Sequence, residues 1–201
     1  MLKWLIFYDI DEFIFLKNYN NIKDFLNEPK FNKCKIINLN WVHHTDNNLI
    51  HYENKSVIER FPKKFYNESQ DQMNELVDFK SIIRGHMRNI KINCVHRLVL
   101  KFEGCDAYGR KYLMRNIKKF NPDNKKYYIN HYFCKSLKEF TLKVKRGSPN
   151  YGINDKNKLY KINKYFLYNK ITKEKIDYIE KETKLNLTEY RNKIKNYKLK
   201  K

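Results

Sequence analysis

Alanine is almost missing from this chain: Ala107 is the single one in 201 residues. Lys, Asn, Ile and Tyr together make up 97 of the 201 residues. Codons for these four amino acids are rich in A and T, whereas Ala codons are rich in G and C, so a strongly AT-biased genome produces this composition without selection for a basic surface. The net charge of +21 is therefore weak support for a nucleic-acid-binding protein.

Arginine is also scarce, with 8 Arg against 35 Lys. Because Arg is the usual bidentate reader of phosphate, we expect no specific nucleic-acid partner and only a weak, salt-sensitive affinity for polyanions. Long apolar runs are missing too: none approaches the roughly 18 residues of a membrane span. Residues 1–7 contain no small-residue cleavage site. The sequence thus predicts a cytoplasmic chain without a transmembrane segment.

Cys-x-x-Cys pairs are absent, which favours reduced core cysteines over a disulfide framework. The four cysteines are Cys34, Cys94, Cys105 and Cys134. A zinc site could be drawn with His96 and His131 beside three of these cysteines, but the spacing matches no usual zinc template. Three Asn-x-Ser/Thr sequons are expected by chance in a chain so rich in Asn, and would matter only in a secretory lumen: Asn54, Asn67 and Asn186.

Charge and turn residues divide the chain near residue 150, and no internal repeat is present. Residues 1–150 carry a net charge of +12 and residues 151–201 a net charge of +9, with Gly147, Pro149 and Gly152 at the boundary. We expect an α/β domain over 1–150, built on a mixed sheet flanked by helices, and a basic helical extension over 151–201.

Apolar periodicity predicts the elements of this fold. The continuous apolar run over 4–8 suits a strand that is buried on both faces in the middle of a sheet. Ser136 and Glu139 form a capping box that begins a helix ending at Gly147. Other strand-like segments are 35–42, 56–61, 80–84 and 91–100, and other helix-like segments are 21–26, 173–184 and 188–197.

Asp9 and Asp11 follow the first apolar run, at the end of a predicted strand, where ligands bind in α/β sheets. Residues two apart in an extended stretch point to the same side, and two carboxylates there can hold Mg²⁺ or Mn²⁺, which neutralises a diphosphate leaving group. An Asp-x-Asp at a strand end also opens the motif of haloacid-dehalogenase-type phosphatases. In those enzymes Thr or Val usually stands where this chain has Phe13, so that alternative is weak.

A second group of candidate residues surrounds the predicted helix start at Ser136. Lys135 and the free N–H groups of a helix N-terminus would make a cradle for a diphosphate. His131 precedes them and is a candidate third metal ligand, although a lone His is more often structural.

Glu59 stands between apolar residues of the predicted strand over 56–61, beside Arg60. A carboxylate there fits a general base that deprotonates a sugar hydroxyl. A buried structural ion pair is the alternative and fits slightly better, and both interpretations stay open. His96, His43 and His44 are weaker candidates for an acceptor pocket, in which Trp41 would cover the apolar face of a sugar ring.

The segment over 4–14, WLIFYDIDEFI, resembles the Asp-x-Asp segment of glycosyltransferase family 92 and related family 2-like enzymes. Further segments resemble later family elements in the same order, over residues 2–147 in all. They are Asn40-Trp41, the Glu-Arg-Phe element at 57–61, the Lys-Ser-Ile element at 80–84, Val95-His96, and the closing block from His131 to Gly147.

This resemblance implies a GT-A-type fold, a nucleotide-sugar donor such as a UDP-sugar, a glycan acceptor, and Mn²⁺ or Mg²⁺. Asp9 and Asp11 would bind the metal and the diphosphate-ribose, and His131, or second His96, would be the late metal-binding histidine. Glu59 would be the acceptor base. Lys135 and Ser136 would assist the diphosphate.

In the family a nucleotide-binding region precedes the Asp-x-Asp strand, whereas here the motif begins at Asp9. The sequence therefore predicts either a partial glycosyltransferase or an inactive remnant or subunit that pairs with a protein supplying the missing half. A basic nucleic-acid-binding module is the weakest of the three alternatives.

Overall fold

The computed structural model describes residues 3–65, 78–86, 103–113, 125–147 and 154–198. The chain forms two compact units, which differ from the expected division near residue 150. We call Met1–Val42 with Tyr66–His131 the sheet unit, and His43–Phe65 with Tyr132–Lys201 the helical unit. No helix in the described ranges combines the length and the apolar character needed to cross a membrane.

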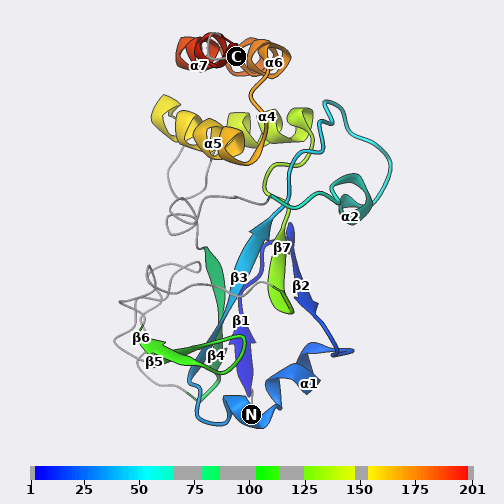
Figure 1. Cartoon of the computed structure of the whole chain (residues 1–201), viewed down its shortest axis with the longest axis vertical. Helices are drawn as coiled ribbons and strands as arrows, with labels where there is room; N and C mark the ends of the chain where they lie inside the picture. The colour runs from blue at the N-terminus through cyan, green and yellow to red at the C-terminus, as the bar shows by residue number, and fades with distance from the viewer. Residues whose placement is uncertain (1–2, 66–77, 87–102, 114–124, 148–153, 199–201) are drawn as a thin grey trace. The chain divides into compact units, whose positions relative to one another are not determined.

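The sheet unit is built on a curled mixed sheet, so the fold is mixed α/β (Figure 1). Its strand order is β1-β4-β3-β5-β6, and β7 pairs with β2 and β3. The β3–β5 pair is parallel, whereas β1–β4, β3–β4, β5–β6 and β2–β7 are antiparallel. The strands are β1 (Trp4–Ile6), β2 (Glu12–Leu16), β3 (Ile36–His43), β4 (Phe79–Arg84), β5 (Glu103–Asp106), β6 (Lys111–Leu113) and β7 (Tyr127–His131).

β3 is the central strand, since it pairs with β4, β5 and β7 and all eight of its residues are buried. The strands predicted over 35–42 and 80–84 are confirmed by β3 and β4. The predicted central position of the first apolar run is wrong: β1 pairs with β4 at the start of the strand order, and Leu5 on it is 38% exposed. An apolar run alone does not distinguish a central strand from one whose outward residues happen to be apolar.

An apolar cluster lies in the described part of the sheet unit and is drawn mainly from β3, β7 and two short helical turns. Helix α1 (Ile22–Leu26) begins at Asn21, whose side chain accepts a hydrogen bond from the Asp24 N–H, and confirms the helix predicted over 21–26. A 3-10 turn follows at Pro29–Phe31. The buried members of the cluster are Phe25, Phe31, Cys34, Ile37, Leu39, Trp41, Ile82, Cys105, Ala107, Tyr127 and Ile129.

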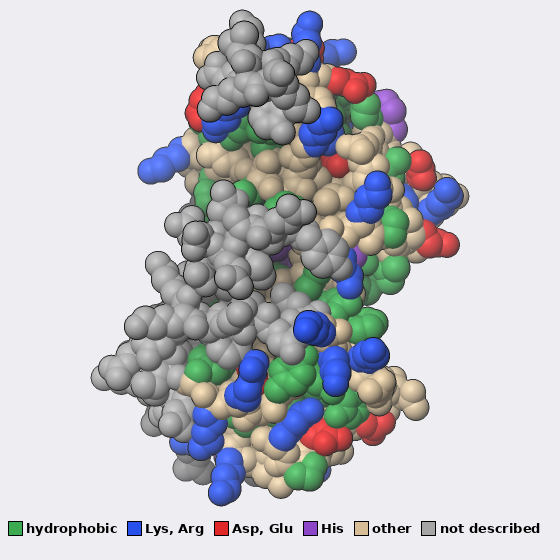
Figure 2. Space-filling view, viewed as in Figure 1, with side chains coloured by type: hydrophobic (Ala, Val, Ile, Leu, Met, Phe, Trp, Pro, Cys, Tyr) green, Lys and Arg blue, Asp and Glu red, His purple; other side chains and the backbone are tan. Residues whose placement is uncertain are grey.

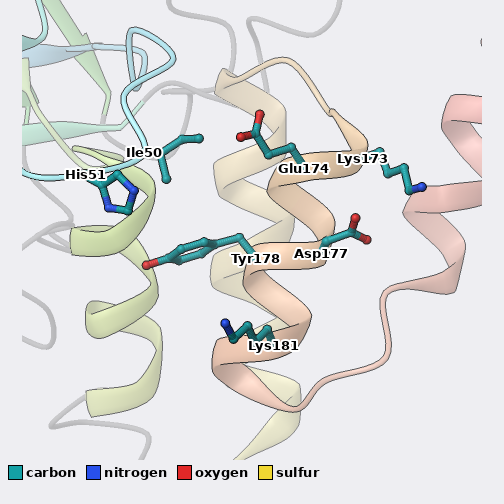
Figure 3. A pocket seen from close by; sticks show the side chains of 7 residues that line it. All are labelled: Ile50, His51, Lys173, Glu174, Asp177, Tyr178 and Lys181. Carbon is teal, nitrogen blue, oxygen red and sulfur yellow. The ribbon is translucent and has the colours of Figure 1, made fainter.

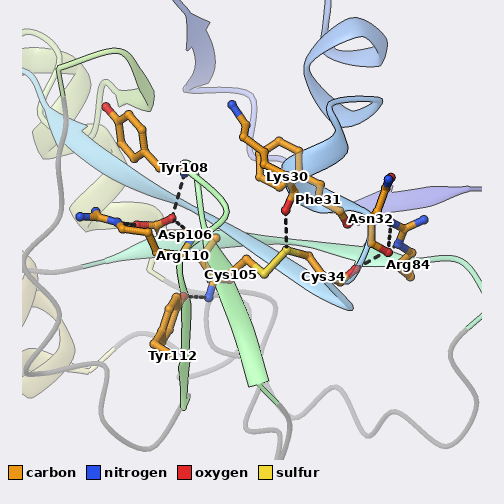
Figure 4. The surroundings of a disulfide bond; sticks show 11 residues. Lys30, Phe31, Asn32, Cys34, Arg84, Cys105, Asp106, Tyr108, Arg110 and Tyr112 are labelled. Carbon is orange, nitrogen blue, oxygen red and sulfur yellow. Dashed lines mark hydrogen bonds and ion pairs between the residues drawn. A yellow bond between two sulfur atoms is a disulfide. The ribbon is translucent and has the colours of Figure 1, made fainter.

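Cys34 and Cys105 form a disulfide, so the prediction of reduced cysteines is wrong for this pair (Figure 4). Their Cα atoms lie 5.8 Å apart, although 71 positions separate them in the sequence. Such a pairing depends on the register of β5 beside β3, which cysteine spacing cannot show. The disulfide also removes Cys105 from any zinc site. Cys134 is a free, buried thiol.

Backbone contacts brace both ends of the disulfide (Figure 4). Arg84 donates hydrogen bonds to the carbonyl groups of Phe31 and Cys34 at 2.8 and 3.0 Å. Asp106 accepts hydrogen bonds from the backbone N–H groups of residues 108 and 110 and so closes the β5–β6 turn. Gly109 in this turn has φ +81°, and a Cβ there would lie 2.9 Å from the Lys30 carbonyl oxygen, so this position requires glycine.

The helical unit contains α2 (Val57–Arg60), α4 (Leu137–Arg146), α5 (Asp155–Tyr168), α6 (Lys173–Thr183) and α7 (Thr188–Lys198). Helix α4 contacts α5 and α6, and α6 contacts α7 (Figure 1). The helices predicted over 136–147, 173–184 and 188–197 are confirmed, including the Ser136–Glu139 capping box and the Gly147 C-cap. Helix α5 is not predicted by the sequence.

The strand predicted over 56–61 is wrong, because this segment is helix α2. The Ser56 side chain accepts a hydrogen bond from the Glu59 N–H, and the Glu59 carboxylate accepts one from the Ser56 N–H. This reciprocal cap outweighs the β preference of Val57 and Ile58. The strand predicted over 91–100 lies outside the described residues.

Candidate functional site

Asp9, Asp11 and Glu12 lie where β1 leads into β2, and the pairing of β2 with β7 brings His131 to them. The antiparallel register sets Glu12 opposite His131. The Asp11 Oδ1 and His131 Nε2 atoms are 3.9 Å apart, and both side chains are largely buried. Two of the predicted site residues, Asp11 and His131, which are 120 positions apart in the sequence, therefore meet at one end of a two-stranded ladder.

Lys80 on β4 joins this group, although sequence reasoning did not single it out as a site residue. Its Nζ lies 2.8 Å from the Asp9 Oδ2 and 3.3 Å from the Glu12 Oε1, and its side chain is 1% exposed. Burying an unpaired ammonium group costs free energy of folding. The two carboxylates offset this cost and allow the Lys80 side chain to be buried on β4. The one sequence feature that could have identified Lys80 is its position inside a largely apolar strand segment, FKSIIR.

The environment of the Glu12 carboxyl group favours its neutral, protonated form. Burial raises its pKa to about 7, against the opposing attraction of Lys80. Asp9, in contrast, keeps about half of its side chain exposed, at 49%. The cluster therefore combines a buried acid that exchanges its proton near pH 7 with an accessible carboxylate. Perturbed groups of this kind concentrate at functional sites, and structural ion pairs also produce them.

An aromatic ring bounds the cluster. The Trp41 ring centroid is 4.1 Å from that of His131, and the Lys80 Nζ lies 5.7 Å from the Trp41 ring centroid. Trp41 itself is 9% exposed. Since Trp41 is mostly covered, it fixes the His131 ring and offers little open surface for stacking of a sugar.

The predicted metal ligands are only partly brought together. No group of three or more His, Cys, Asp or Glu side chains within the described residues is arranged to hold a metal ion. Asp9 pairs with Lys80, which leaves Asp11 and His131 as a two-ligand set. Ligand atoms lie about 2.1 Å from a metal, so two ligands of one ion are at most about 4.2 Å apart, and the 3.9 Å spacing falls within that limit. Mg²⁺ typically binds through one or two carboxylates plus substrate phosphates, and of this pair Asp11 supplies one carboxylate.

The predicted diphosphate cradle at the N-terminus of α4 is filled by the protein itself. The Glu139 N–H donates to the Ser136 Oγ, and the N–H groups of Leu137 and Lys138 donate at 2.9 Å to the carbonyl groups of Leu49 and Ile50. Ser136 is fully buried, and its hydroxyl donates to the Glu139 carboxylate. The first three N–H groups of the helix are therefore engaged. Neither Ser136 nor the helix end beside Lys135 offers a donor to an anion.

Glu59 belongs to the helical unit and is occupied as a helix cap. Its Oε2 accepts hydrogen bonds from the Ser56 N–H and hydroxyl at 2.9 and 2.6 Å. These bonds lower the pKa of the Glu59 carboxyl, whereas a general base works best with a pKa near the operating pH. Glu59 is also exposed, so the interpretation as a buried ion pair is wrong, and the structure does not support the general base either. The neighbouring Arg60 is buried and pairs instead with Glu139, with Nη1–Oε2 and Nη2–Oε1 distances of 2.6 and 3.2 Å.

The remaining histidine candidates are packed into the helical unit. His43 stacks on Tyr168 with ring centroids 4.2 Å apart. His44 donates from Nδ1 to the Phe61 carbonyl at 2.7 Å and lies against Tyr132. Both side chains are buried, which supports packing roles over an acceptor pocket. His96 lies outside the described residues.

An open groove beside α6 has no convergent chemistry (Figure 3). Tyr178 points to the side where His51 lies, whereas Lys173 and Asp177 point the opposite way. Asp177 is also paired with Arg191 at 2.7 Å. Binding sites gather a few polar groups toward one point, and this groove does not.

The basic residues do not form one binding stripe on the face that Figure 2 shows. Lys and Arg side chains are spread across the described part of that face, with apolar and acidic side chains between them. This scattered pattern agrees with a positive charge that comes from the biased amino-acid composition. It does not support a nucleic-acid-binding surface.

Comparisons with known proteins add nothing to this geometry. No protein-family model matches the chain, and neither the curated proteins nor the solved structures contain a significant match.

Proposed function

We propose that the sheet unit carries the metal- and diphosphate-binding part of a glycosyltransferase, which transfers a sugar from a nucleotide donor, a UDP-sugar first, to a glycan hydroxyl. The observation that carries the proposal is the convergence of Asp9, Asp11 and Glu12 with Lys80 and His131 from three separate segments. The resemblance of the Asp-x-Asp segment to glycosyltransferase family 92 supports it.

Each member of the cluster has a distinct role in this proposal. Asp11 and His131 would hold Mn²⁺ or Mg²⁺, and the half-exposed Asp9 would face the ribose and diphosphate of the donor. A metal bound there would supply positive charge to neutralise a diphosphate leaving group. Lys80 holds Asp9 in place through their 2.8 Å ion pair. Glu59 and Ser136 are not included, because each serves a helix cap, and Lys135 is not included, because it belongs to the helical unit.

A thermal-shift panel tests donor binding directly. The purified chain is heated with Mn²⁺ and with UDP, GDP or CDP, singly and together. We expect UDP to raise the melting temperature only when Mn²⁺ is present, because a ligand that binds the folded state alone stabilises it. Asp11→Asn and His131→Gln should abolish this rise. Asp24→Asn, a matched change of an exposed carboxylate in the same unit, should retain it.

A thermal-shift panel without a nucleotide effect would favour a different function for this chain. A chain that melts cooperatively yet shows no nucleotide-dependent rise would contradict donor binding. It would favour a non-catalytic remnant or a subunit, for which the closure of the α4 N-terminus is the specific support. A subunit is recognised in gel filtration by its co-elution with a partner chain.

A further inference from the structure

The turn between α6 and α7 presents one asparagine to solvent on an otherwise anchored segment. Asn186 is exposed, while Leu185 and Leu187 on either side of it are buried, at 8% and 1% exposed. The Leu187 N–H also donates to the Glu180 carboxylate at 2.7 Å. The backbone at Asn186 is therefore fixed, and a large group attached to its side chain would displace nothing in the core.

Thr188, two residues on, is bound to the same side chain. Its backbone N–H and its hydroxyl both donate to the Asn186 Oδ1, at 2.9 and 2.6 Å. Bonds accepted by the amide oxygen draw electron density from the amide nitrogen and make the Nδ2 protons easier to remove. Since both bonds use Oδ1, neither engages Nδ2. This arrangement requires a hydroxyl residue two positions after the asparagine, which is the sequon pattern.

A second feature, in the other unit, points to where the chain folds. The Cys34–Cys105 disulfide forms when two thiols lose two protons and two electrons to an oxidant. Structural disulfides persist in oxidising compartments such as the secretory lumen and are rare in the cytosol. The disulfide thus disagrees with the cytoplasmic location that the sequence predicts.

From these two independent features we propose that Asn186 is an N-glycosylation site, modified in the oxidising lumen where the disulfide forms. The Asn186 Nδ2 forms a bond to the anomeric carbon of a lipid-linked oligosaccharide diphosphate. The bond from that carbon to the diphosphate oxygen breaks, the lipid diphosphate leaves, and Nδ2 gives up one proton. This assignment does not depend on the proposed glycosyltransferase function.

The sequon at Asn54 differs in a way that makes it the internal control. Asn54 is also exposed, but the Ser56 hydroxyl and N–H both donate to the Glu59 carboxylate. Ser56 is thereby committed to the cap of α2 and not to Asn54. The third sequon, at Asn67, lies outside the described residues.

Peptide mapping of the full chain from its native cells tests the assignment. Trypsin cleaves after Lys184 and Arg191 and releases residues 185–191, which contain the sequon. We expect this peptide to carry a glycan that peptide N-glycosidase removes in heavy-oxygen water, leaving a labelled Asp at 186. Without reductant, the peptides containing Cys34 and Cys105 should be recovered joined. Recovery of 185–191 solely as the unmodified peptide would overturn the assignment.

Variants expressed in the same cells separate the roles of the side chains. Asn186→Gln and Thr188→Ala should each remove the glycan and the matching shift on gels, whereas Thr188→Ser should keep it. Asn54→Gln should change nothing. A glycan that survives Thr188→Ala, or that disappears with Asn54→Gln, would contradict the proposal.

Discussion

The buried Glu12 of the sheet unit and the partly buried Glu139 of the helical unit are both paired with a cation, yet their pKa values move in opposite directions. Burial works to raise the pKa of Glu139, but hydrogen bonds from Arg60 and Ser136 outweigh it and hold the pKa below its usual range. At Glu12 burial outweighs the attraction of Lys80 and raises the pKa to about 7. The Arg60 guanidinium donates two hydrogen bonds to the Glu139 carboxylate alone, whereas the Lys80 ammonium is shared between the carboxylates of two residues.

The same contrast extends to the other charged groups. In the helical unit Asp46 pairs with Lys175 at 2.6 Å, and the Tyr165 hydroxyl donates to the same carboxylate, all in the core. In the sheet unit the charged cluster includes the half-exposed Asp9. In the helical unit, the buried Asp46–Lys175 pair joins a loop to a helix. In the sheet unit, the buried charged side chains surround the accessible carboxylate of Asp9, and for this reason we place the proposed donor site in the sheet unit.

The largest effect on stability is expected from breaking the buried Asp46–Lys175 ion pair of the helical unit. Lys175→Met should lower the free energy of unfolding by about 3–5 kcal/mol, because it leaves the Asp46 carboxylate buried without its cation. Urea denaturation followed by far-UV circular dichroism measures this. Lys173→Met, two positions earlier on the exposed side of α6, should cost less than about 0.5 kcal/mol.

A double variant distinguishes loss of the charge pair from loss of packing. Adding Asp46→Asn to Lys175→Met should recover part of the stability, since no charge is then left unpaired. A cost for Lys175→Met equal to that of Lys173→Met would show that the buried pair is not holding the helical unit.

The next effect concerns the disulfide of the sheet unit. Replacing Cys34 and Cys105 together by Ala should cost about 2–4 kcal/mol, because the cross-link closes a loop of 71 positions in the unfolded chain. Reductant should lower the stability of the natural chain by a similar amount and leave the double variant unchanged. Cys134→Ala should keep the sensitivity to reductant, because Cys134 is a free thiol.

The two glutamates should give opposite pH dependences. The Glu12 pKa lies higher in the folded chain than its ordinary value of 4.5, so the folded state binds the proton more tightly. The stability of the natural chain relative to Glu12→Gln should therefore be greatest below about pH 4.5 and fall as the pH rises toward 7.

For Glu139 the folded pKa is lowered, so its contribution is present above the ordinary pKa and lost as the pH falls. Stability relative to Glu139→Gln should rise with pH in the acid range. Urea midpoints collected from about pH 2 to about pH 8 reach below the ordinary glutamate pKa and above the raised pKa of Glu12, and they measure both differences. Slopes of the same sign would remove the contrast between the units.

The smallest effect on stability is expected at Asp9, the carboxylate that we propose faces the donor. Asp9→Asn should cost less than about 1 kcal/mol, because the side chain is 49% exposed and Lys80 keeps Glu12 as a partner. The same variant should weaken the Mn²⁺-dependent stabilisation by UDP. A loss of stability as large as that of Lys175→Met would mean that Asp9 is structural.

Local signals predicted much of the fold. The capping box at Ser136–Glu139 and the cap at Asn21 fix helix starts through bonds within four residues, so the sequence reveals them. The same Ser-x-x-Glu signal stands at Ser56–Glu59, but Val57 and Ile58 between the caps suggested a strand. Helix α5 was missed because its buried face is partly Tyr, which a simple apolar pattern does not count, as at Tyr165 and Tyr168.

The candidate site was predictable only in part, because its pairings are long-range. Asp9 and Asp11 were identified from their position at a strand end, and His131 from its place before a predicted helix start. The ion pair from Asp9 to Lys80 spans 71 positions, and no local pattern encodes it. The N–H groups at the start of α4 were expected to be open, and the loop carrying Leu49 and Ile50 closes them from almost 90 positions away.

The pairing of β2 with β7 sets a rule for how relatives of this chain can differ. Glu12 opposite His131 is one end of the ladder, and Leu16 opposite Tyr127 is the other. Between residues 17 and 126, length changes confined to the loops outside the helices and strands leave the Glu12–His131 end of this ladder unchanged. One residue inserted within 12–16 or 127–131 would turn the side chains beyond it to the other face and separate His131 from Asp11. Divergent relatives should therefore vary freely in the intervening loops while carrying no gap inside these two short strands.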